Sequence, residues 1–361
     1  MARIDLADLA HSYQGPAADP ASWALKPISM TWRQGGAYAL LGPSGCGKTT
    51  LLNLISGLVK PSRGRILFDG DDVTPLSTQR RNIAQVFQFP VIYDTMTVAE
   101  NLAFPLKNRG MPRQKIAERV AEIAQLLDLT PYLARKATRL SADAKQKISL
   151  GRGLVRPDVA AILFDEPLTV IDPHLKWELR SKLKALHRAL DLTMIYVTHD
   201  QTEALTFADT VVVMQDGMVV QSGTPQQLFE KPEHTFVGYF IGSPGMNILP
   251  AAVQGRRAHI SGHPISLTRN YDRLPAGAKI EIGVRPEFIR ATSPMPTLLS
   301  ARLERVDDLG RIRFAQVRVG EQKLAAHIPA GTNLSGTDVG LAFDPAHVHV
   351  YADSRLIEGT A

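Results

Sequence analysis

An octapeptide near the N-terminus constrains the fold more than any other feature of the sequence. Residues 42–49 read Gly-Pro-Ser-Gly-Cys-Gly-Lys-Thr, which matches the phosphate-binding pattern G-x-x-x-x-G-K-[ST]. The apolar run 37–41 precedes the motif, and Thr49–Leu58 is predicted to form a helix directly after it. The glycines let backbone N–H groups converge on phosphate oxygens, assisted by the N-terminus of that helix. The motif therefore predicts a nucleotide-binding α/β fold.

Lys48 and Thr49 carry the most specific chemistry of this loop. A lysine at this position reaches the β- and γ-phosphates of a nucleotide, and the threonine hydroxyl is placed to ligate Mg²⁺. A glycine turn of no consequence is the alternative, and the strand and helix on either side argue against it. The candidate cofactor-binding residues of the loop are Gly42, Pro43, Ser44, Gly45, Cys46, Gly47, Lys48, Thr49 and Thr50.

Apolar runs alternate with helical patterns as far as residue 214. The predicted strands are Arg65–Phe68, Ile83–Phe87, Ala160–Phe164, Met194–Val197 and Thr210–Met214. This alternation predicts an α/β layered architecture with a largely parallel central sheet. Residues 89–157 are expected to form a mainly helical insertion, because apolar residues recur at helical spacing over 113–129.

The sequence changes character after about residue 245. Polar and apolar residues alternate over Lys279–Val284 and Arg311–Val319, with glycine and proline turns between them, which predicts a small β-barrel-like domain. The linker is expected at Gly242–Gly245, so that the domains span 1–242 and 246–361.

Composition excludes several classes of protein. The 361 residues are 44% hydrophobic, which predicts a folded chain with a sizeable core. A single cysteine rules out a disulfide framework and cysteine-based metal clusters. No apolar run approaches the ~18–20 residues of a membrane span, and no secretion leader is recognisable at the N-terminus. We therefore expect a soluble protein that remains in the compartment where it is made.

The net charge of +6 is concentrated in one segment. Residues 107–156 hold twelve Lys and Arg but only four Asp and Glu. Such a segment could face nucleic acid, an anionic membrane surface or simply solvent. Because no interleaved aromatic residues support base stacking, a nucleic-acid partner is not expected.

A second candidate site lies where an apolar strand ends in two acids. The run Ala161–Phe164 is followed directly by Asp165 and Glu166, at the strand end where ligands gather in parallel sheets. Asp165 is predicted to hold Mg²⁺ through water, and Glu166 to act as base toward the attacking water. An ordinary strand end on the surface is the alternative, which the nucleotide loop upstream disfavours.

Two polar residues follow other strands of the same predicted sheet. His199 comes after Met194–Val197, and Gln88 comes after Ile83–Phe87. Each would be unremarkable alone, as a loop or capping residue. At the end of a neighbouring strand, His199 is placed to contact the γ-phosphate.

Taken together, these motifs resemble the ATP-binding subunit of ABC transporters, almost from end to end. The resemblance implies ATP and Mg²⁺ as cofactors, with Gln88 as the Q-loop glutamine that contacts the metal and His199 as the switch histidine. Asp172 takes the D-loop position, and Tyr13 is where the family stacks an aromatic ring on adenine. The helical segment 89–157 would dock on two transmembrane permease subunits at the cytoplasmic face of the inner membrane.

The resemblance narrows to importers of carbohydrates and polyols, such as the maltose and glycerol-3-phosphate systems. Residues 240–247 look like the junction into their C-terminal regulatory domain, and Gly283–Glu287 looks like a signature within it. In that family the domain is a small oligonucleotide-binding-like β fold. A periplasmic or extracellular solute-binding protein is an indirect partner in such systems.

The chain departs from the family at its signature motif. Where the family has Leu-Ser-Gly-Gly-Gln, residues 140–144 read Leu-Ser-Ala-Asp-Ala, so Ser141 is kept and both glycines are lost. In the family this segment closes on the γ-phosphate bound to a second subunit. A Cβ at Ala142 and at Asp143 hinders that approach, and the carboxylate repels the phosphate. We therefore expect a paralogous ATPase partner with an intact signature, as in two-ATPase glycerol importers; a homodimer that tolerates the drift is the alternative.

Other function classes fit the sequence less well. A soluble ABC ATPase of translation or DNA repair usually has two tandem cassettes or a long coiled coil, and neither is recognisable here. A non-hydrolysing regulatory subunit has no physical need for the base Glu166 and for His199. A simple kinase would not explain the Q-loop, the switch histidine and the β domain together.

Overall fold

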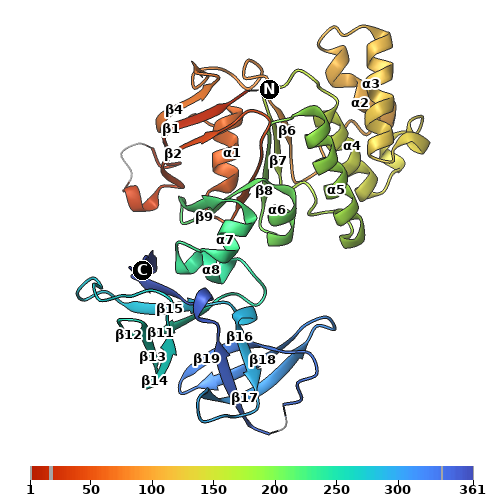
Figure 1. Ribbon diagram of the computed structural model, residues 1–361. Helices are drawn as coiled ribbons and strands as arrows, with labels where there is room; N and C mark the ends of the chain where they lie inside the picture. The colour runs from red at the N-terminus through yellow and green to blue at the C-terminus, as the bar shows by residue number, and fades with distance from the viewer. Residues whose placement is uncertain (1, 16–18, 335, 361) are drawn as a thin grey trace. The chain divides into compact units, whose positions relative to one another are not determined.

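The computed structural model describes residues 2–15, 19–334 and 336–360 (Figure 1). The chain forms two compact units, Met1–Pro225 and Gln226–Ala361. The division lies before the junction expected at 242–245. The helices α7 (Pro225–Glu230) and α8 (Thr235–Phe240) precede that junction, and the carbonyls of Phe229 and Ile241 accept hydrogen bonds from Arg285 of the second unit.

The first unit is built on a six-stranded sheet with the order β10-β9-β3-β8-β7-β6. Only β10 is antiparallel to its neighbour, which confirms the largely parallel sheet. The strands β3 and β8 are buried along their whole length, as expected for a sheet covered on both faces. The strands are β3 (Ala37–Leu41), β6 (Ala84–Val86), β7 (Ile162–Asp165), β8 (Met194–Thr198), β9 (Thr210–Gln215) and β10 (Met218–Gly223).

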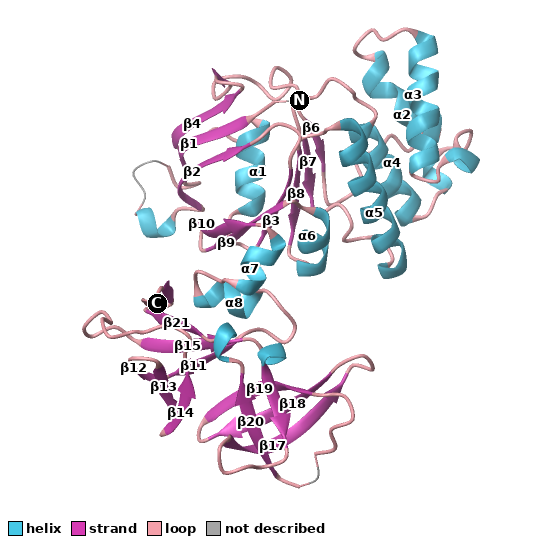
Figure 2. Ribbon diagram, in the orientation of Figure 1, coloured by secondary structure: helices cyan, strands magenta, loops and turns pink. Residues whose placement is uncertain are grey.

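Helices follow these strands and place their N-termini beside the strand ends that bear the candidate residues. The helix α1 (Lys48–Ser56) follows β3, α5 (Pro173–Leu190) follows β7, and α6 (Gln201–Phe207) follows β8 (Figure 2). The predicted helix after the phosphate-binding motif is thus present and begins at Lys48.

A second, antiparallel sheet in this unit has the order β2-β1-β4-β5. The predicted strand Arg65–Phe68 belongs to this sheet as part of β4, so its expected place in the parallel sheet is wrong. Its physical partner is β1, with Ile4 opposite Phe68. The strands are β1 (Ile4–His11), β2 (Leu25–Trp32), β4 (Arg63–Phe68) and β5 (Asp71–Asp72), and a short 3-10 turn lies at Pro20–Ser22.

The segment 89–157 contains three α-helices: α2 (Val98–Lys107), α3 (Arg113–Leu126) and α4 (Ala142–Leu154). Thr97 begins α2 with a capping box, in which its side chain and that of Glu100 satisfy each other's backbone N–H groups. The apolar residues predicted to face inward on α3, Ile116, Val120 and Ile123, are buried. Short 3-10 helices lie at Thr130–Tyr132 and Ala137–Arg139.

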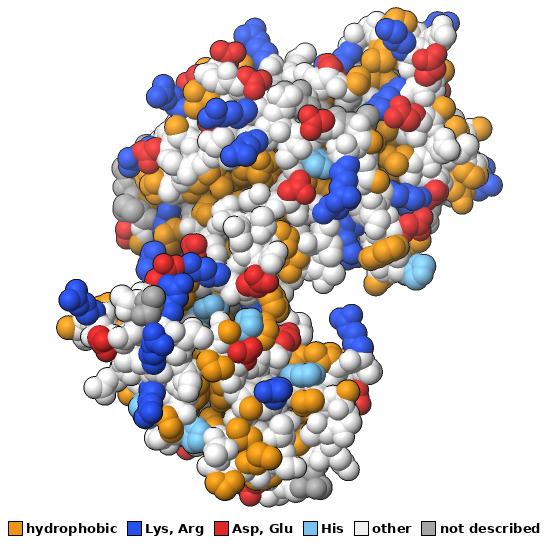
Figure 3. Space-filling view, in the orientation of Figure 1, with side chains coloured by type: hydrophobic (Ala, Val, Ile, Leu, Met, Phe, Trp, Pro, Cys, Tyr) orange, Lys and Arg blue, Asp and Glu red, His pale blue; other side chains and the backbone are white. Residues whose placement is uncertain are grey.

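The basic residues of this segment are partly paired with acids. Arg109 contacts Asp158, and Lys145 contacts Asp94 at 3.0 Å. On the face of the first unit drawn in Figure 3, blue Lys and Arg side chains are interspersed with red Asp and Glu. This face is therefore of mixed charge.

The second unit contains a closed barrel of five strands, β16-β19-β18-β17-β20, which confirms the predicted β-barrel. Two further sheets have the orders β11-β15-β21-β22 and β12-β13-β14, and the predicted strand 279–284 lies in the first of them as β15 and not in the barrel. The barrel strands are β16 (Ile289–Thr292), β17 (Leu299–Asp308), β18 (Arg313–Val319), β19 (Gln322–Ile328) and β20 (Asp338–Phe343). The other strands are β11 (Asn247–Pro250), β12 (Ala252–Gln254), β13 (Arg257–Ile260), β14 (His263–Ser266), β15 (Ile280–Val284), β21 (His349–Ala352) and β22 (Arg355–Ile357), with 3-10 helices at Pro286–Phe288 and Pro345–His347.

Within the described residues, no helix is both long enough and apolar enough to traverse a lipid bilayer.

Candidate active site

The phosphate-binding loop joins β3 to α1 and leaves the start of the helix open. Gly47 caps α1 in a left-handed conformation (φ 100°) and has no side chain to satisfy the first amides of the helix. A Cβ at Gly47 would lie 2.6 Å from the carbonyl oxygen of Ala24, and a Cβ at Gly42 would lie 2.3 Å from that of Met214. Both positions therefore require glycine, and the free N–H groups of the first turn form a ready anion site.

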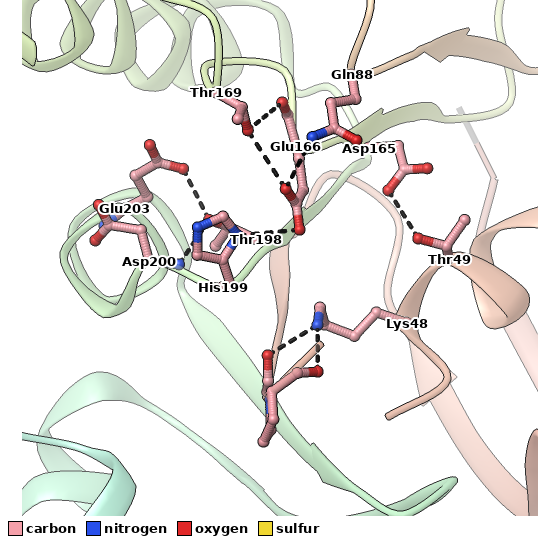
Figure 4. A network of polar contacts seen from close by, with 12 residues as sticks. Lys48, Thr49, Gln88, Asp165, Glu166, Thr169, Thr198, His199, Asp200 and Glu203 are labelled. Carbon is pink, nitrogen blue, oxygen red and sulfur yellow. Dashed lines mark hydrogen bonds and ion pairs between the residues drawn. The ribbon is translucent and has the colours of Figure 1, made fainter. Parts of the chain in front are cut away.

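Lys48 is buried and held by the loop itself (Figure 4). Its ammonium donates hydrogen bonds to the carbonyl oxygens of Gly42 at 2.8 Å and Pro43 at 2.9 Å. Cys46 lies beside it, and burial raises the pKa of the Cys46 thiol. A pre-oriented positive charge inside an apolar loop is well suited to attract a polyphosphate.

Thr49 and Asp165 meet across two elements. The Thr49 hydroxyl at the start of α1 donates to the Asp165 carboxylate at the end of β7, at 3.1 Å. Burial raises the pKa of Asp165, since the charged carboxylate is partly removed from water. Hydroxyl and carboxylate oxygens are hard ligands of the kind that Mg²⁺ prefers, and this pair fits an ion that also bonds to substrate phosphates.

Glu166 follows Asp165 and lies at the centre of a polar cluster (Figure 4). Its carboxylate is 3.1 Å from Nδ1 of His199 and 3.5 Å from Nε2 of Gln88. The Thr169 hydroxyl donates to the same carboxylate at 3.4 Å. Glu166 has a positive φ of 46°, an uncommon conformation for a residue with a side chain, and such strain often marks an active site.

The parallel sheet explains why these residues meet. Because β7 and β8 are parallel neighbours, the residues after them emerge at the same edge of the sheet. Glu166 is further tied to β8 by its backbone N–H, which donates to the Val197 carbonyl at 3.0 Å. Glu166 is 20% exposed and His199 is 55% exposed. The carboxylate is thus sheltered, yet it can be reached by a water molecule and by a phosphate.

Residues that the sequence analysis missed hold the His199 loop in place. Asp200 caps α6 by accepting from the N–H groups of Thr202 and Glu203. The buried Glu203 carboxylate accepts from the hydroxyl of Thr198 at 2.8 Å and from that of Tyr196 at 3.1 Å. Asp200 is recognisable in the sequence as a helix-capping residue. The sequence gives no signal that the Glu203 side chain is buried.

Tyr13 lies over the first turn of α1. Its hydroxyl is 3.3 Å from the hydroxyl of Thr50, and the residue is 65% exposed. Tyr13 and the phosphate-binding loop are therefore brought together, although 29 residues separate Tyr13 from Gly42 in the sequence.

Residues 140–144, where the family's signature motif was expected, lead into α4. Ser141 is the N-cap and accepts from the backbone N–H of Ala144 at 3.3 Å. The Asp143 carboxylate lies in the first turn, 3.9 Å from the Lys147 ammonium. Among the described residues, no hydrogen bond or ion pair joins 141–143 to the loop 42–49. Asp172, which was expected at the D-loop position, caps α5 by accepting from the backbone N–H of His174 at 2.9 Å.

Comparison with family models agrees with this geometry. Residues 25–169 match the ABC transporter family, residues 242–289 match the MalK OB fold domain, and residues 282–351 match the TOBE domain. The first range includes the phosphate-binding loop, Gln88, Asp165 and Glu166 but not Tyr13 or His199, and the other two ranges include most of the β strands of the second unit.

Individual proteins show the same similarity over nearly the whole chain. The sn-glycerol-3-phosphate import ATP-binding protein UgpC of Escherichia coli K12 is 40% identical over 331 residues, 91% of each chain. The protein of that name from Paracoccus denitrificans is 38% identical, covering 99% of this chain and 100% of its own length. Among solved structures, cbiO1 of Clostridium perfringens, part of the ABC transporter complex cbiONQ, matches 63% of this chain and 90% of its own, with 28% identity and a TM-score of 0.57. The chain belongs to the ABC transporter family, as an ATP-binding ATPase subunit of the importer type whose cassette is followed by OB and TOBE domains.

Proposed function

We propose that this chain hydrolyses ATP to energise a bacterial importer of a carbohydrate or polyol, acting at the cytoplasmic face of the inner membrane with two permease subunits. One observation carries the proposal: Lys48, the Thr49–Asp165 pair and the Glu166–His199 pair converge at one edge of the parallel sheet. The similarity to sn-glycerol-3-phosphate import proteins supports a polyol or its phosphate as the solute class, with glycerol as a further candidate. A solute-binding protein would deliver the solute to the permeases.

The residues divide the work of binding between them. The open amides of α1 and the Lys48 ammonium bind the β- and γ-phosphates, and Tyr13 stacks on the adenine. Thr49 and Asp165, with Gln88, would hold Mg²⁺, which neutralises phosphate charge when it is bound. The contact between Thr49 and Asp165 supports this assignment, because the two oxygens already face each other.

Glu166 and His199 act at the γ-phosphate. Glu166 accepts a proton from the attacking water, and its position beside His199 and Gln88, sheltered but 20% exposed, supports that role. Nδ1 of His199 faces Glu166, and the other ring nitrogen is placed to donate to the γ-phosphate when both ring nitrogens carry a proton. Gln88 lies against the same carboxylate and connects the nucleotide site to the segment 89–157, which would dock on the permeases.

Transport by membrane vesicles tests this function. The complex is expressed with its own permeases, and uptake of labelled glycerol, glycerol 3-phosphate and maltose is measured with the wild-type chain and with Lys48→Ala. ATP-dependent uptake of a polyol that is lost in Lys48→Ala supports the proposal. ATP hydrolysis without uptake of any solute by the intact assembly contradicts it.

The altered signature supports a finer proposal, that a second, different ATPase completes the working site. Ala142 and Asp143 add side chains at the start of α4, where the family's glycines let a neighbouring nucleotide approach the helix amides. The Asp143–Lys147 distance of 3.9 Å leaves the carboxylate only partly compensated. In this arrangement Lys48, Gln88, Glu166 and His199 face the intact signature of the partner.

Counting the ATPase chains tests this pairing. Native mass spectrometry of the complex purified from membranes is expected to show one copy of this chain and one paralogue. Robust ATP turnover by an assembly that contains two copies of this chain and no other ATPase contradicts the pairing, while leaving the importer function intact.

A further inference from the structure

Tyr13 does not stand alone at the mouth of the nucleotide site. Its ring meets that of His11 at right angles, with the ring centroids 4.6 Å apart. His11 is the last residue of β1, and Tyr13 lies two positions later in the turn that follows the strand. Perpendicular aromatic pairs at this distance have a favourable electrostatic geometry. Because the residue is 65% exposed, Tyr13 still presents ring surface to a ligand.

His11 is itself fixed by the core. Its side chain is buried, with only 7% of the residue exposed, and Nδ1 lies 3.3 Å from the Ser62 hydroxyl. Ser62 also holds the backbone on either side of His11. Its hydroxyl accepts from the Ser12 N–H at 3.1 Å, and its own N–H donates to the Ala10 carbonyl at 3.0 Å. The His11 ring is thus a rigid support, anchored in the pairing of β1 with β4.

The backbone around Tyr13 is also held. The Gln14 N–H donates to the Ser12 hydroxyl at 3.2 Å, and the Gly15 N–H donates to the Ser12 carbonyl at 3.3 Å. These bonds define the turn on which Tyr13 is carried, but they leave its side-chain rotation free. Among the described residues, the His11 ring and the Thr50 hydroxyl contact the Tyr13 side chain.

We propose that His11 is a positioning residue for base recognition, which holds the ring plane of Tyr13 ready to stack on the adenine of ATP. This inference rests on the proposed function, because it requires that Tyr13 receives the base. Immobilising an aromatic side chain costs free energy on binding, and a ring that is already oriented avoids much of that cost. His11 touches the base contact and not the phosphates, so its effect is confined to ligands that carry a base.

Burial lowers the pKa of His11, so the ring is neutral at pH 7. A neutral imidazole supports Tyr13 as an aromatic surface, and its charge plays no part. Phenylalanine can therefore supply the ring contact with Tyr13, although not the Ser62 hydrogen bond, and an aliphatic residue of similar size supplies neither.

Two variants of the full-length chain separate these possibilities. His11→Leu fills the space without a ring, and His11→Phe restores a ring. Isothermal titration calorimetry is carried out with Mg-ATP and with Mg-tripolyphosphate, which has the phosphates but no base. We expect His11→Leu to weaken Mg-ATP binding by about threefold to tenfold, with tripolyphosphate affinity unchanged and Mg-ATP affinity recovered in His11→Phe.

A double variant completes the design. In a Tyr13→Ala background, His11→Leu is expected to cause no further loss of Mg-ATP affinity, because the ring that it positions is gone. If His11→Leu lowers the affinity for Mg-ATP and for Mg-tripolyphosphate equally, His11 supports only the loop. If it leaves the affinity for Mg-ATP unchanged, His11 does not position Tyr13. Either result overturns the inference. If the wild-type chain binds tripolyphosphate and Mg-ATP equally well, the base is not recognised, and the assignment of Tyr13 itself fails.

Discussion

Replacing Glu166 by glutamine removes the base while keeping the shape of the site. The carboxylate is 3.1 Å from His199, 3.5 Å from Gln88 and 3.4 Å from the Thr169 hydroxyl, so an amide of the same size keeps an oxygen for the donors. What is lost is the capacity to accept a proton from water. Proton transfer by a positioned side chain is worth about 10²–10⁴ in rate, which is roughly 3–5 kcal/mol in the activation barrier.

We therefore expect Glu166→Gln to lower steady-state ATP turnover by at least about a hundredfold. Mg-ATP affinity is expected to stay close to that of the wild type, because neither Lys48 nor Thr49 contacts Glu166. The assay is phosphate release by the permease-bound complex, together with the amount of nucleotide retained after rapid gel filtration, which should rise as the closed state accumulates. Glu178→Gln is the matched control, since Glu178 is an α5 carboxylate whose ion-pair partner is Lys182.

Two results would refute this reasoning. Turnover in Glu166→Gln within about threefold of the wild type would mean that the base is elsewhere, because it is far less than general base catalysis supplies. A loss of Mg-ATP binding equal to the loss of turnover would mean that Glu166 acts on affinity and not on the chemical step.

Three further predictions follow from individual contacts. The double variant Ala142→Gly, Asp143→Gly restores the family's signature glycines and removes a carboxylate. At an effective dielectric of ~20, that carboxylate repels a phosphate charge ~4 Å away by an energy of the order of 4 kcal/mol. ATP turnover by complexes containing only this ATPase should therefore rise at least tenfold by a rough estimate, and an unchanged rate would contradict the proposed defect. Arg285→Met should destabilise the second unit by about 2–4 kcal/mol in urea unfolding, because the buried guanidinium donates to the carbonyls of Leu228, Phe229, Gly238 and Ile241; the exposed Arg302→Met should change little. Burial lowers the pKa of His349, so the folded state favours the neutral form of its ring. The free energy of unfolding should therefore fall as the pH drops through about 6.5. His349→Gln should flatten that part of the pH profile, and an identical profile would exclude this histidine as the cause.

The candidate site was the most predictable part of the molecule. The loop 42–49 has a fixed pattern, and Glu166 and His199 follow apolar strands whose carboxyl ends must share an edge in a parallel sheet. The meeting of Glu166 with His199 therefore follows from strand order. The contact of Thr169 with Glu166 does not, since it depends on the rotation of one side chain in a turn.

The antiparallel sheet was less predictable, for two physical reasons. The strand β2 (Leu25–Trp32) contains Pro27, and β1 (Ile4–His11) has register shifts where it pairs with both neighbours, so neither has a clean alternating pattern. The sequence therefore predicts the strand Arg65–Phe68 but not the antiparallel sheet to which it belongs. Pairing between distant segments, as between Ile4 and Phe68, leaves no local trace in the sequence.

The second unit shows the same limit at a single residue. Arg285 is recognisable as part of a motif, but its carbonyl partners on α7 and α8 lie 44 to 57 residues earlier in the chain. Burial among those carbonyls lowers the pKa of Arg285 to about 10 and draws the two helices into the second unit. The linker expected at 242–245 rests on a local glycine and proline pattern, and such a pattern does not reveal contacts between residues this far apart in the chain.

The central claim is that main-chain amides and one lysine capture the triphosphate of ATP. Calorimetric titration of the intact assembly with Mg-ATP, comparing the wild type with Lys48→Ala and Lys48→Arg, measures this most directly. The account predicts saturable binding by the wild type, a loss of at least about a hundredfold in Lys48→Ala, and partial recovery in Lys48→Arg. Mg-ATP binding of equal affinity in the wild type and Lys48→Ala would contradict it.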